Sequence, residues 1–599
     1  MNLSVACLGG AGEIGMNMYV YETPKYALIV DAGVKFARAE DPGVDLIIPD
    51  FEYLKSLENK KEILLLITHG HEDHTGAIPF LLSEFPNISV VSNSYTIDLF
   101  KHKLLEYGIS LDRIIHITPY NAFEWGDMEI TAIPISHSIH GTTAIKIKFE
   151  DGFVAVHMSD YKIDTAPVTS DPFPIKDFLN LGNEGVNLLL SDSTNILNPH
   201  FTRGEYIVKN NLRKIFQKTT GRIFFTTFAS NTERLQTLFD LAVEFKKKIV
   251  IEGSSLLRNI ETARNYNKLS INEDLIINRK AMKNYENNEL LVIATGSQGE
   301  FSSVISKIAR NEYGNMNVLH DDTYIFSSRI IPGNEQYVLY IINNINRNNA
   351  NCYTAENLPI HVSGHASKFD AELLLKLLKP DYLVPVHGEA QHLKEHKLTA
   401  IKLGMKKDHV ITWYAGEKIF FKDGYFDYKE EIPAGKRFVD RKSGEILSQD
   451  ELKNRRRLSV EGTILLVIKK PILNYLDKDM YLLESIGYST DFYDKNRLIN
   501  EMISQVELYC KPIFGDYVDK RFNQQYPSLA KDDNYNLYTE LYNKILNDNL
   551  SGETQYIDEI FDYDDLINVY KKNIHKYFKK YYNIKPAIKI IDINKNKSF

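Results

Sequence analysis

The densest group of chemically useful side chains follows the apolar run "EILLLIT", in the stretch "HGHEDH". His69, His71, Asp73 and His74 give it the spacing H-x-H-x-D-H. A loop and the first turn of a helix behind a strand could direct all four toward one point, and imidazole and carboxylate groups are zinc ligands. The spacing differs from the H-E-x-x-H pattern of zinc proteases, because "HEDH" places its histidines three residues apart. The stretch therefore predicts a metal site of another kind.

Three further candidate ligands stand at the ends of strand-like runs: His137 in "PISHSI", Asp160 in "HMSD" and His387 in "VPVHGE". With them the set has five imidazoles and two carboxylates, which suits two divalent metal ions, with Zn²⁺ expected first and Mn²⁺ or Mg²⁺ as alternatives. Two metals in one site lower the pKa of a bound water and stabilise an in-line displacement at a phosphate. Hydrolysis of a phosphodiester there would leave a 5′ phosphate and a 3′ hydroxyl.

The stretch "GAGEIG", residues 10–15, matches the G-x-G-x-x-G pattern of dinucleotide-binding proteins, and Asp31 lies near the distance expected of a ribose-binding acid. That pattern must open a helix whose N-terminus meets the pyrophosphate. Two strand-like runs follow here instead, "MNMYVYET" and "KYALIVDAG". We therefore expect a tight glycine turn and no dinucleotide site.

Composition limits the class of protein. The 599 residues are 43% hydrophobic and 25% charged, as in a globular chain with several cores. Three scattered cysteines exclude a disulfide framework and favour a cytoplasmic location, and neither a signal peptide nor membrane insertion is expected. The net charge of −8 gives no overall basic signature, so nucleic-acid binding would depend on bound metal or on local patches. The basic stretches 455–457 and 571–580 are such patches or are simply solvated.

The order of elements predicts three domains. Strand-like runs dominate up to about residue 195, and strands then alternate with helices, which is typical of a parallel sheet covered by helices. Strand signals return at "LPIHVSGH" and "DYLVPVHGE", and a last segment is expected to form a sheet with helices. The predicted segments are 1–197 and 351–430 for the first domain, 198–350 for an inserted second, 431–462 for a linker and 463–599 for the third.

The ligand order H-x-H-x-D-H followed by isolated His, Asp and His resembles that of the metallo-β-lactamase fold. The motifs "SDSTN", "HVSGHAS" and "VHGE" are similar to those of its β-CASP nuclease branch. Together with "LGGAGEIGMN", "TFASN", "TGSQGE", "IPGNE" and "RRRLSVEGTILLVI", they make residues 4 to 470 resemble the bacterial ribonuclease J family. The resemblance implies an α/β fold: a metallo-β-lactamase αββα sandwich, an inserted β-CASP α/β domain and a small α+β C-terminal domain.

The resemblance also implies a role for each ligand. One metal would be held by His69, His71 and His137, the other by Asp73, His74 and His387, and Asp160 would bridge both. Asp31 would orient the histidine cluster without binding metal.

By the same resemblance, Asp192 and His365 would steer the attacking water and protonate the leaving 3′ oxygen, in an order that stays open. The alternatives are a turn or cap for Asp192 and an ordinary loop histidine at position 365. Ser230, His361 and Ser363 would bind the substrate in a pocket sized for one phosphate, so that a 5′-monophosphate end is preferred. Ser230 or Asn231 could instead only cap the helix that follows.

The implied function is a metal-dependent ribonuclease with 5′-to-3′ exonuclease and endonuclease activity, in mRNA decay and rRNA maturation. RNA would be its partner, in a homodimer or tetramer, with other RNA-decay proteins as further candidates. A β-CASP DNA-repair nuclease is the alternative, although such enzymes typically carry valine at the position of His387. A thioesterase or β-lactam hydrolase would not need the insertion. Ala77, "HMSD", "SIHG" and Arg329 depart from the family pattern but remove no ligand, which opposes a silent RNA-binding scaffold.

Overall fold

The computed structural model describes residues 2–37, 41–314, 316–331, 333–468, 478, 481–486, 494–525, 563–582, 586–592 and 597–598. The chain divides into two compact units. The first contains the N-terminal segment up to Ala37 and residues Asp45–Arg441, and the second contains Arg38–Val44 and the chain from Lys442 onward.

Two sheets form the larger part of the first unit. The first sheet has eight strands, in the order β23 (Tyr425–Glu431), β22 (Glu417–Lys422), β1 (Asn2–Gly9), β3 (Met18–Glu22), β4 (Tyr26–Val30), β7 (Glu62–Leu66), β8 (Ser89–Ser92) and β9 (Ile114–His116). The second has six, in the order β10 (Ala122–Trp125), β11 (Met128–Pro134), β12 (Thr143–Phe149), β13 (Val154–His157), β14 (Leu188–Asp192) and β20 (Tyr382–Val386). Strands β4, β7, β8 and β9 are mutually parallel, and so are β13, β14 and β20. Several strands of each sheet therefore end at a common edge.

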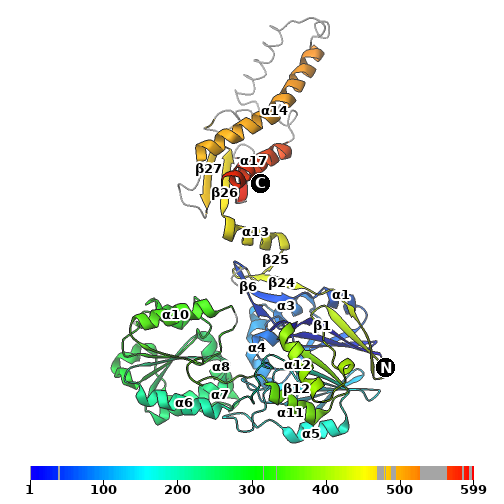
Figure 1. The fold of residues 1–599 in the computed structure, drawn as a ribbon, viewed down its shortest axis with the longest axis vertical. Helices are drawn as coiled ribbons and strands as arrows, with labels where there is room; N and C mark the ends of the chain where they lie inside the picture. Colours follow the sequence, from blue (N-terminus) through cyan, green and yellow to red (C-terminus); the bar gives the residue numbers. More distant parts are fainter. Residues whose placement is uncertain are drawn as a thin grey trace. The chain divides into compact units, whose positions relative to one another are not determined.

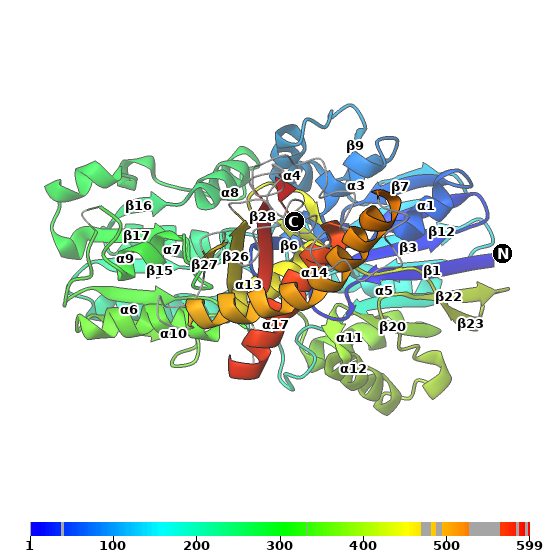
Figure 2. The same cartoon turned by 90° about the horizontal axis from the view of Figure 1, so that it is seen from above.

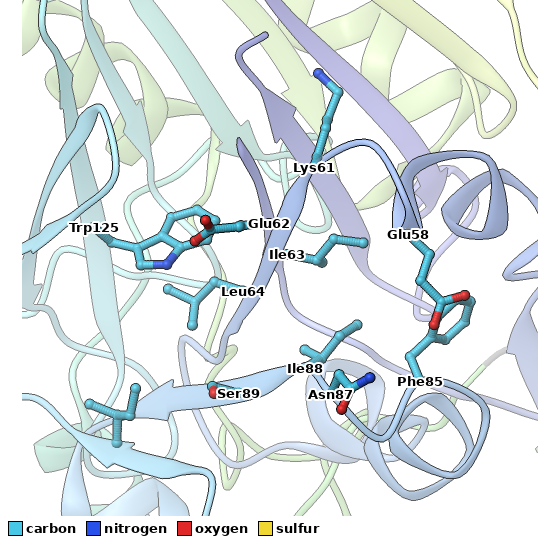
Figure 3. Close-up of a pocket in the computed structure, with 11 residues that line it drawn as sticks. Glu58, Lys61, Glu62, Ile63, Leu64, Phe85, Asn87, Ile88, Ser89 and Trp125 are labelled. Atoms are coloured by element: carbon cyan, nitrogen blue, oxygen red, sulfur yellow. The ribbon is translucent and has the colours of Figure 1, made fainter. Parts of the chain in front are cut away.

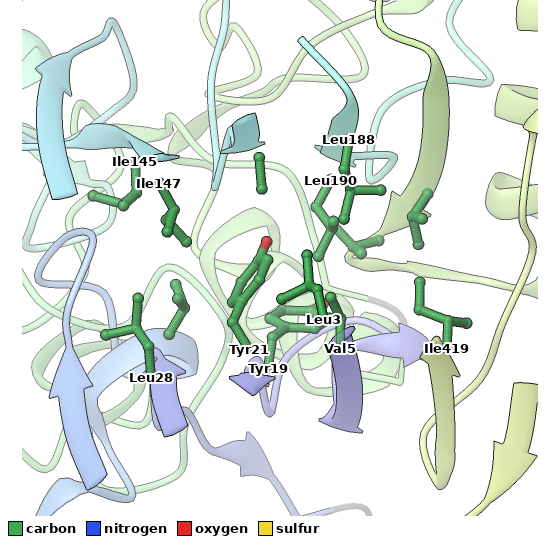
Figure 4. Packing of buried hydrophobic residues seen from close by; sticks show 14 of the residues in the cluster. Leu3, Val5, Tyr19, Tyr21, Leu28, Ile145, Ile147, Leu188, Leu190 and Ile419 are labelled. Carbon is green, nitrogen blue, oxygen red and sulfur yellow. The ribbon is translucent and has the colours of Figure 1, made fainter. Parts of the chain in front are cut away.

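A hydrophobic core lies between these two sheets (Figure 4). Tyr19 and Tyr21 of β3 face it from one sheet, and Ile145, Ile147 and Leu190 face it from the other. The intervening strand positions, such as Val20 and Ile29, are also buried because they face helices on the outside. Burial on both faces explains why these strands read as nearly continuous apolar runs.

Helices cover both outer faces and complete the αββα sandwich. The first sheet packs against α1 (Glu52–Glu58), α3 (Ile78–Glu84) and α4 (Ser94–Glu106), and the second against α5 (Ile175–Glu184), α11 (Lys368–Leu378) and α12 (Ala390–Lys402). The short helix α2 (Glu72–Thr75) follows β7.

The smaller part of the first unit is an all-parallel sheet, as predicted for the insertion. Its order is β16 (Lys248–Glu252), β17 (Leu290–Ala294), β15 (Ile223–Thr226), β18 (Thr323–Phe326) and β19 (Asn351–Thr354). One face packs against α6 (Glu205–Lys218), α7 (Thr232–Glu244) and α8 (Ser254–Asn265), and the other against α9 (Val304–Ala309) and α10 (Glu335–Arg347). Figure 1 shows α6 and α10 on opposite faces, and Figure 2 shows β16, β17 and β15 side by side. The sheet ends at Thr354, just beyond the predicted boundary at residue 350. Short 3₁₀ helices occur at Glu273–Leu275, Arg279–Asn284, Asn287–Glu289 and Lys407–His409.

The strand predicted at "LPIHVSGH" is wrong, because these residues form a loop. Their carbonyl groups bond to side chains from distant parts of the chain instead of to a neighbouring strand. The carbonyl of Ile360 accepts from Arg234, that of Gly364 faces His137, and that of His365 accepts from Thr202. Long-range contacts therefore override the local pattern of apolar residues.

The stretch "GAGEIG" forms the predicted glycine turn. Gly10, Gly12 and Gly15 have positive φ, and no helix follows. Within it, β2 (Ala11–Gly12) pairs with β21 (Gly388–Glu389), directly after His387. The turn thus supports the loop that carries a predicted metal ligand.

The stretch 431–462, predicted as a linker, contains β24 (Lys436–Asp440), β25 (Ile446–Leu447) and α13 (Gln449–Glu461). Strand β24 joins β6 (Val44–Pro49) and β5 (Lys35–Phe36) in a sheet. In the second unit, Arg455, Arg456 and Arg457 donate to Gly43, Asp41 and Pro586 of the same unit, which favours a structural role for this basic stretch.

The second unit contains the predicted sheet with helices. The sheet order is β27 (Tyr481–Ile486), β26 (Thr463–Ile468), β28 (Ala587–Asp592) and β29 (Lys597–Ser598). Helices α14 (Lys495–Gln525) and α17 (Tyr563–Tyr582) share a core with it. The acidic stretch 553–565 lies largely outside the described residues. Among the described residues, no helix combines the length and apolar character needed to cross a membrane.

Candidate metal centre

All seven predicted metal ligands come together at strand ends of the αββα sandwich. His69, His71, Asp73 and His74 follow β7, and the other three residues, His137, Asp160 and His387, follow β11, β13 and β20. Their ligand atoms form two groups that could each hold a metal ion, with all atoms of a group within 4.8 Å of one another: His69, His71, His137 and Asp160, and Asp73, His74, Asp160 and His387. Asp160 belongs to both groups, as expected of a bridging ligand.

The first group has the spacing of a coordination tetrahedron. His71 Nδ1 lies 3.1 Å from both His69 Nε2 and His137 Nε2. Asp160 Oδ2 lies 3.8 Å from His69 Nε2 and 3.7 Å from His137 Nε2. Four ligands at about 2.0–2.1 Å from one ion would be roughly 3.3 Å apart. The group therefore matches the size of a four-coordinate metal site.

Hydrogen bonds on the outer side of each imidazole determine which nitrogen faces inward. His69 Nδ1 lies 3.0 Å from Thr68 Oγ1, and His137 Nδ1 lies 2.7 Å from the carbonyl oxygen of Gly364. His71 Nε2 lies 3.0 Å from Ser230 Oγ. When these outer nitrogens donate their protons, the inner nitrogens are left with lone pairs that point at one another. A cation between them fits this arrangement, because it accepts all three lone pairs.

The second group shares Asp160 Oδ2, which lies 3.3 Å from His74 Nε2. Asp73 Oδ2 lies 3.3 Å from His387 Nε2 and 3.8 Å from His74 Nε2. Asp160 Oδ2 and His387 Nε2 are buried, and within the described residues neither makes a hydrogen bond. Buried polar atoms without a partner are costly, and metal coordination would satisfy both of them.

Burial keeps the first group in the protonation state that metal ligation requires. It lowers the pKa of His71 to about 4, and it holds the pKa values of His69 and His137 well below that of free imidazole. Burial acts against the charge of Asp160, but His387 and His74 hold its pKa well below the ordinary carboxyl value. Neutral imidazoles beside an ionised carboxylate are the forms that bind divalent metal ions.

Asp31 orients the cluster and lies outside both ligand groups, as predicted. Its carboxylate is fully buried and accepts bonds of 2.8 Å from the backbone N–H and the hydroxyl of Thr68. It also lies 2.7 Å from His74 Nδ1, so that His74 Nε2 faces the second group, where Asn17 Nδ2 lies 3.1 Å from it. A carboxylate in this position fixes the tautomer and ring orientation of a ligating histidine.

The predicted catalytic pair lies beside the ligands. His365 Nδ1 is 2.9 Å from Asp192 Oδ2, and both residues form a third group with Asp160 and His387. Burial disfavours charge on His365, but Asp192 and Asp160 raise its pKa above its ordinary value. Asp192 Oδ1 also accepts from the Thr194 N–H at 2.8 Å, so the turn considered as an alternative coexists with the contact to His365.

The three predicted phosphate-binding residues lie on two segments that contact each other. Arg234, on the first turn of α7 after Ser230, donates to the carbonyl of Ile360 at 3.1 Å, directly before His361. His361 Nδ1 is buried and has no hydrogen-bond partner among the described residues. Ser363 Oγ accepts from the His365 N–H at 3.1 Å.

The capping alternative applies to Asn231 and not to Ser230. Asn231 Oδ1 accepts from the Arg234 N–H and caps α7. Ser230 instead contacts His71, so its hydroxyl lies next to a metal ligand.

Sequence reasoning missed Thr68 and Ser159. Ser159 replaces a glycine of the family pattern and has a positive φ of 55°, while its hydroxyl donates to Thr68 Oγ1 at 2.8 Å. Their positions next to His69 and Asp160 were the available signal. At another departure from the family pattern, the side chain of His140 is buried, and its Nε2 lies 2.9 Å from Thr169 Oγ1.

A cleft of about 350 Å³ opens elsewhere on the first unit (Figure 3). Glu62 and Leu64 from the start of β7 line it, with Ser89 from the start of β8 and Trp125. Because β7 and β8 are parallel, this cleft lies at the opposite end of these strands from His69. It is separate from the metal centre.

Comparisons with known proteins agree with this arrangement. Family profiles match at residues 11–151 (metallo-beta-lactamase superfamily), 220–345 (ribonuclease J, beta-CASP domain) and 355–411 (Zn-dependent metallo-hydrolase RNA specificity domain). Ribonuclease J of Helicobacter pylori is 32% identical over 517 residues, which cover 85% of this chain and 74% of that protein. Ribonuclease J 1 of Streptococcus pyogenes is 34% identical over 467 residues (78% and 82%), and ribonuclease J of Mycolicibacterium smegmatis is 33% identical over 438 residues (73% and 78%).

A crystal structure of a protein of unknown function from Enterococcus faecalis covers 70% of this chain and 100% of its own, with a TM-score of 0.50 and 14% identity, which supports the fold alone. Fold, site and profiles together define a metal-dependent hydrolase with a metallo-β-lactamase fold and an inserted β-CASP domain. Its site uses divalent metal ions, and its substrate is RNA. The extent and level of identity show that the chain belongs to the ribonuclease J family.

Removing one ligand from either group should lower the amount of metal bound at the site and abolish hydrolysis. We expect His71→Ala and Asp73→Ala to bind less metal than the parent, because each loses one coordinating side chain. Elemental analysis of dialysed protein measures bound metal, and digestion of labelled RNA measures activity. His320→Ala, whose side chain is 76% exposed, is the control and should match the parent. Full metal content and activity in both ligand variants would rule out this assignment.

The backbone of Ser159 stores strain that its hydroxyl offsets. Ser159→Ala keeps the positive φ and loses the bond to Thr68, whereas Ser159→Gly loses the same bond but relieves the strain. We expect the glycine variant to be more stable than the alanine variant by about 1 kcal/mol, the cost of a left-handed conformation for a residue with a Cβ. Urea unfolding of both variants measures the difference, and equal stabilities would show that the conformation carries no strain.

Proposed function

We propose that this ribonuclease degrades RNA both stepwise from the 5′ end and internally, with two zinc ions bound to the ligand groups of the candidate metal centre. The observation that carries the proposal is that the two groups share Asp160 Oδ2 and adjoin the His365–Asp192 pair. One bridging carboxylate between two ions is the arrangement suited to in-line phosphoryl displacement. Histidine-rich ligation favours zinc over magnesium, which prefers oxygen ligands.

The metals, when bound, supply an activated water and charge stabilisation at the phosphate. His365 protonates the leaving 3′ oxygen, and Asp192 holds its ring by accepting from Nδ1 at 2.9 Å. The contact supports this division of roles, because the buried Asp192 reaches His365 while the imidazole remains partly exposed. Asp31 and Thr68 keep the ligand histidines in the tautomers that face the site.

Recognition of a 5′ monophosphate is proposed for Ser230, His361 and Ser363. Burial, and to a lesser extent the nearby guanidinium of Arg234, lower the pKa of His361 to about 3. Arg329 and Lys162 act in the same direction, although Arg234 and Lys162 are themselves paired with Glu205 and Asp164. His361 is therefore a buried imidazole next to basic side chains. A phosphate group fits such a place, and its binding would orient a 5′ end for stepwise cleavage.

His361→Ala should reduce stepwise digestion of 5′-monophosphorylated RNA by at least about tenfold while sparing internal cleavage, because the metal ligands remain in place. Two labelled substrates, one with a free 5′ monophosphate and one circular, separate the two activities. Ser230→Ala is the comparison and should reduce both activities, because Ser230 also contacts the ligand His71. Equal loss of both activities in His361→Ala, or no preference of the parent for monophosphate over triphosphate ends, would place 5′-end recognition elsewhere.

We further propose a homodimer or tetramer in which the second unit provides much of the contact between copies, as the family resemblance implies. Ending the chain after Arg441 removes the larger segment of that unit and avoids a cut inside α13. This variant should be monomeric by light scattering and should cleave RNA less efficiently than the parent. An unchanged oligomer would assign the contact to the first unit.

Three expectations from the sequence stay predictions: the roles in mRNA decay and rRNA maturation, other RNA-decay proteins as partners, and the cytoplasmic location.

A further inference from the structure

Two exposed phenylalanines stack on each other near the catalytic pair. Phe201 is 55% exposed and lies in the loop between β14 and α6, and Phe369 is 42% exposed and lies in the first turn of α11. Their ring centroids are 5.1 Å apart, with an angle of 21° between the ring planes. Neither ring belongs to a buried core. Adjacent exposed aromatic rings are a common feature of binding surfaces.

Hydrogen bonds of the residues next to the rings hold the pair in place. Thr202, next to Phe201, donates its N–H to Asp370 Oδ2 at 3.2 Å, and its hydroxyl accepts from the Ser367 N–H at 3.2 Å. Ser367 caps α11 and bonds to the same carboxylate. The loop is thereby fastened to the helix start that carries Phe369. The rings are pre-organised, so binding a flat ligand would cost little ordering entropy.

The same loop reaches the catalytic histidine. Thr202 Oγ1 donates to the carbonyl of His365 at 3.1 Å, and Asn195 Nδ2 donates to it at 3.3 Å. His365 in turn contacts Asp192. Phe201 is therefore one residue away from Thr202, which contacts the backbone of His365 directly.

Positive charge accompanies the rings. Arg203, which follows Thr202, is exposed, and the described part of the chain gives it no ion pair. Lys368, by contrast, is neutralised by Glu395 at 2.7 Å. Proteins that bind single-stranded nucleic acids combine cations for the backbone with aromatic faces for the bases.

We propose that Phe201 and Phe369 form a stacking platform for one nucleobase next to the scissile phosphate, with Arg203 contacting the RNA backbone. The inference rests on the proposed ribonuclease function and adds a contact to a base, which the metal centre and the phosphate pocket do not provide. Because every base has an aromatic face, this contact binds RNA of any sequence. It suits an enzyme that moves along a strand.

The double variant Phe201→Ala/Phe369→Ala tests the platform. We expect KM for a 5′-monophosphorylated oligoribonucleotide to rise about 5- to 150-fold, because one base-stacking contact is lost, while kcat stays nearly unchanged. Phe369→Tyr alone keeps both aromatic faces and should retain the parent KM. Tyr425→Ala removes an aromatic side chain that is 73% exposed on β23, away from the loop, and should leave KM unchanged.

A second measurement uses the RNA as the variable. A set of oligoribonucleotides that each lack one base near the cleavage site should contain one member whose KM with the parent rises as in the double variant. That member should show no further rise with the double variant, because the same contact is already lost. An unchanged KM in the double variant would overturn the proposal of a stacking platform. A changed oligomeric state of the double variant, measured by light scattering, would also overturn it, because the rings would then form a contact between copies of the chain. A parent that cleaves none of these RNAs would instead refute the proposed function.

Discussion

The site depends on one constraint: several imidazole nitrogens and a carboxylate oxygen point their lone pairs at the same place, and no proton of the protein lies there to bind them. His71 Nδ1 lies 3.1 Å from two other imidazole nitrogens, and the opposite nitrogens of these rings already have partners. Asp160 Oδ2 is buried nearby without a hydrogen bond. Unpartnered polar atoms in a protein interior cost about 1–3 kcal/mol each. The packing of the two sheets must therefore hold these atoms in place at that cost. Bound metal would remove the cost by coordinating them, and it would thereby stabilise the fold.

The insertion is fastened to the sandwich by two consecutive residues of α7. Glu233 is buried and accepts from the backbone N–H groups of Val168 and Ser170 at 2.6 and 2.9 Å, on a loop of the sandwich. Arg234 pairs with Glu205 and also donates to the carbonyl of Ile360. Truncating one partner of such a buried pair is costly, because the remaining charge is left without compensation. This clamp positions Ser230, which precedes α7, beside His71, so the site is built jointly by both parts of the first unit.

The ligands and the fold class could be predicted because their signals are local. Four ligands share six positions of sequence, and the strands buried on both faces read as apolar runs. The loop at "LPIHVSGH" could not be predicted, because Arg234 and Thr202 reach its carbonyl groups from distant segments. The stretch 431–462 was predicted as a linker because it is charged and poor in apolar residues. A surface helix such as α13 needs only a narrow apolar face, so this composition does not exclude a helix. The stacking of Phe201 on Phe369 is likewise invisible in the sequence, since only the fold brings their segments together.

A recurring backbone conformation connects the strand ends to the chemistry. Asp31, Ser159 and His387 each follow β4, β13 or β20 within two residues, and their φ angles are 65°, 55° and 48°. Residues with a Cβ rarely adopt this left-handed conformation, and it reverses the direction in which a side chain leaves the strand. Asp31 and His387 thereby turn a carboxylate and an imidazole into the site, and Ser159 turns the chain so that Asp160 can bridge the two ligand groups. Strained backbone positions cluster at functional sites, and these three lie around one centre, so we infer that the strain is retained because it places these groups at the site.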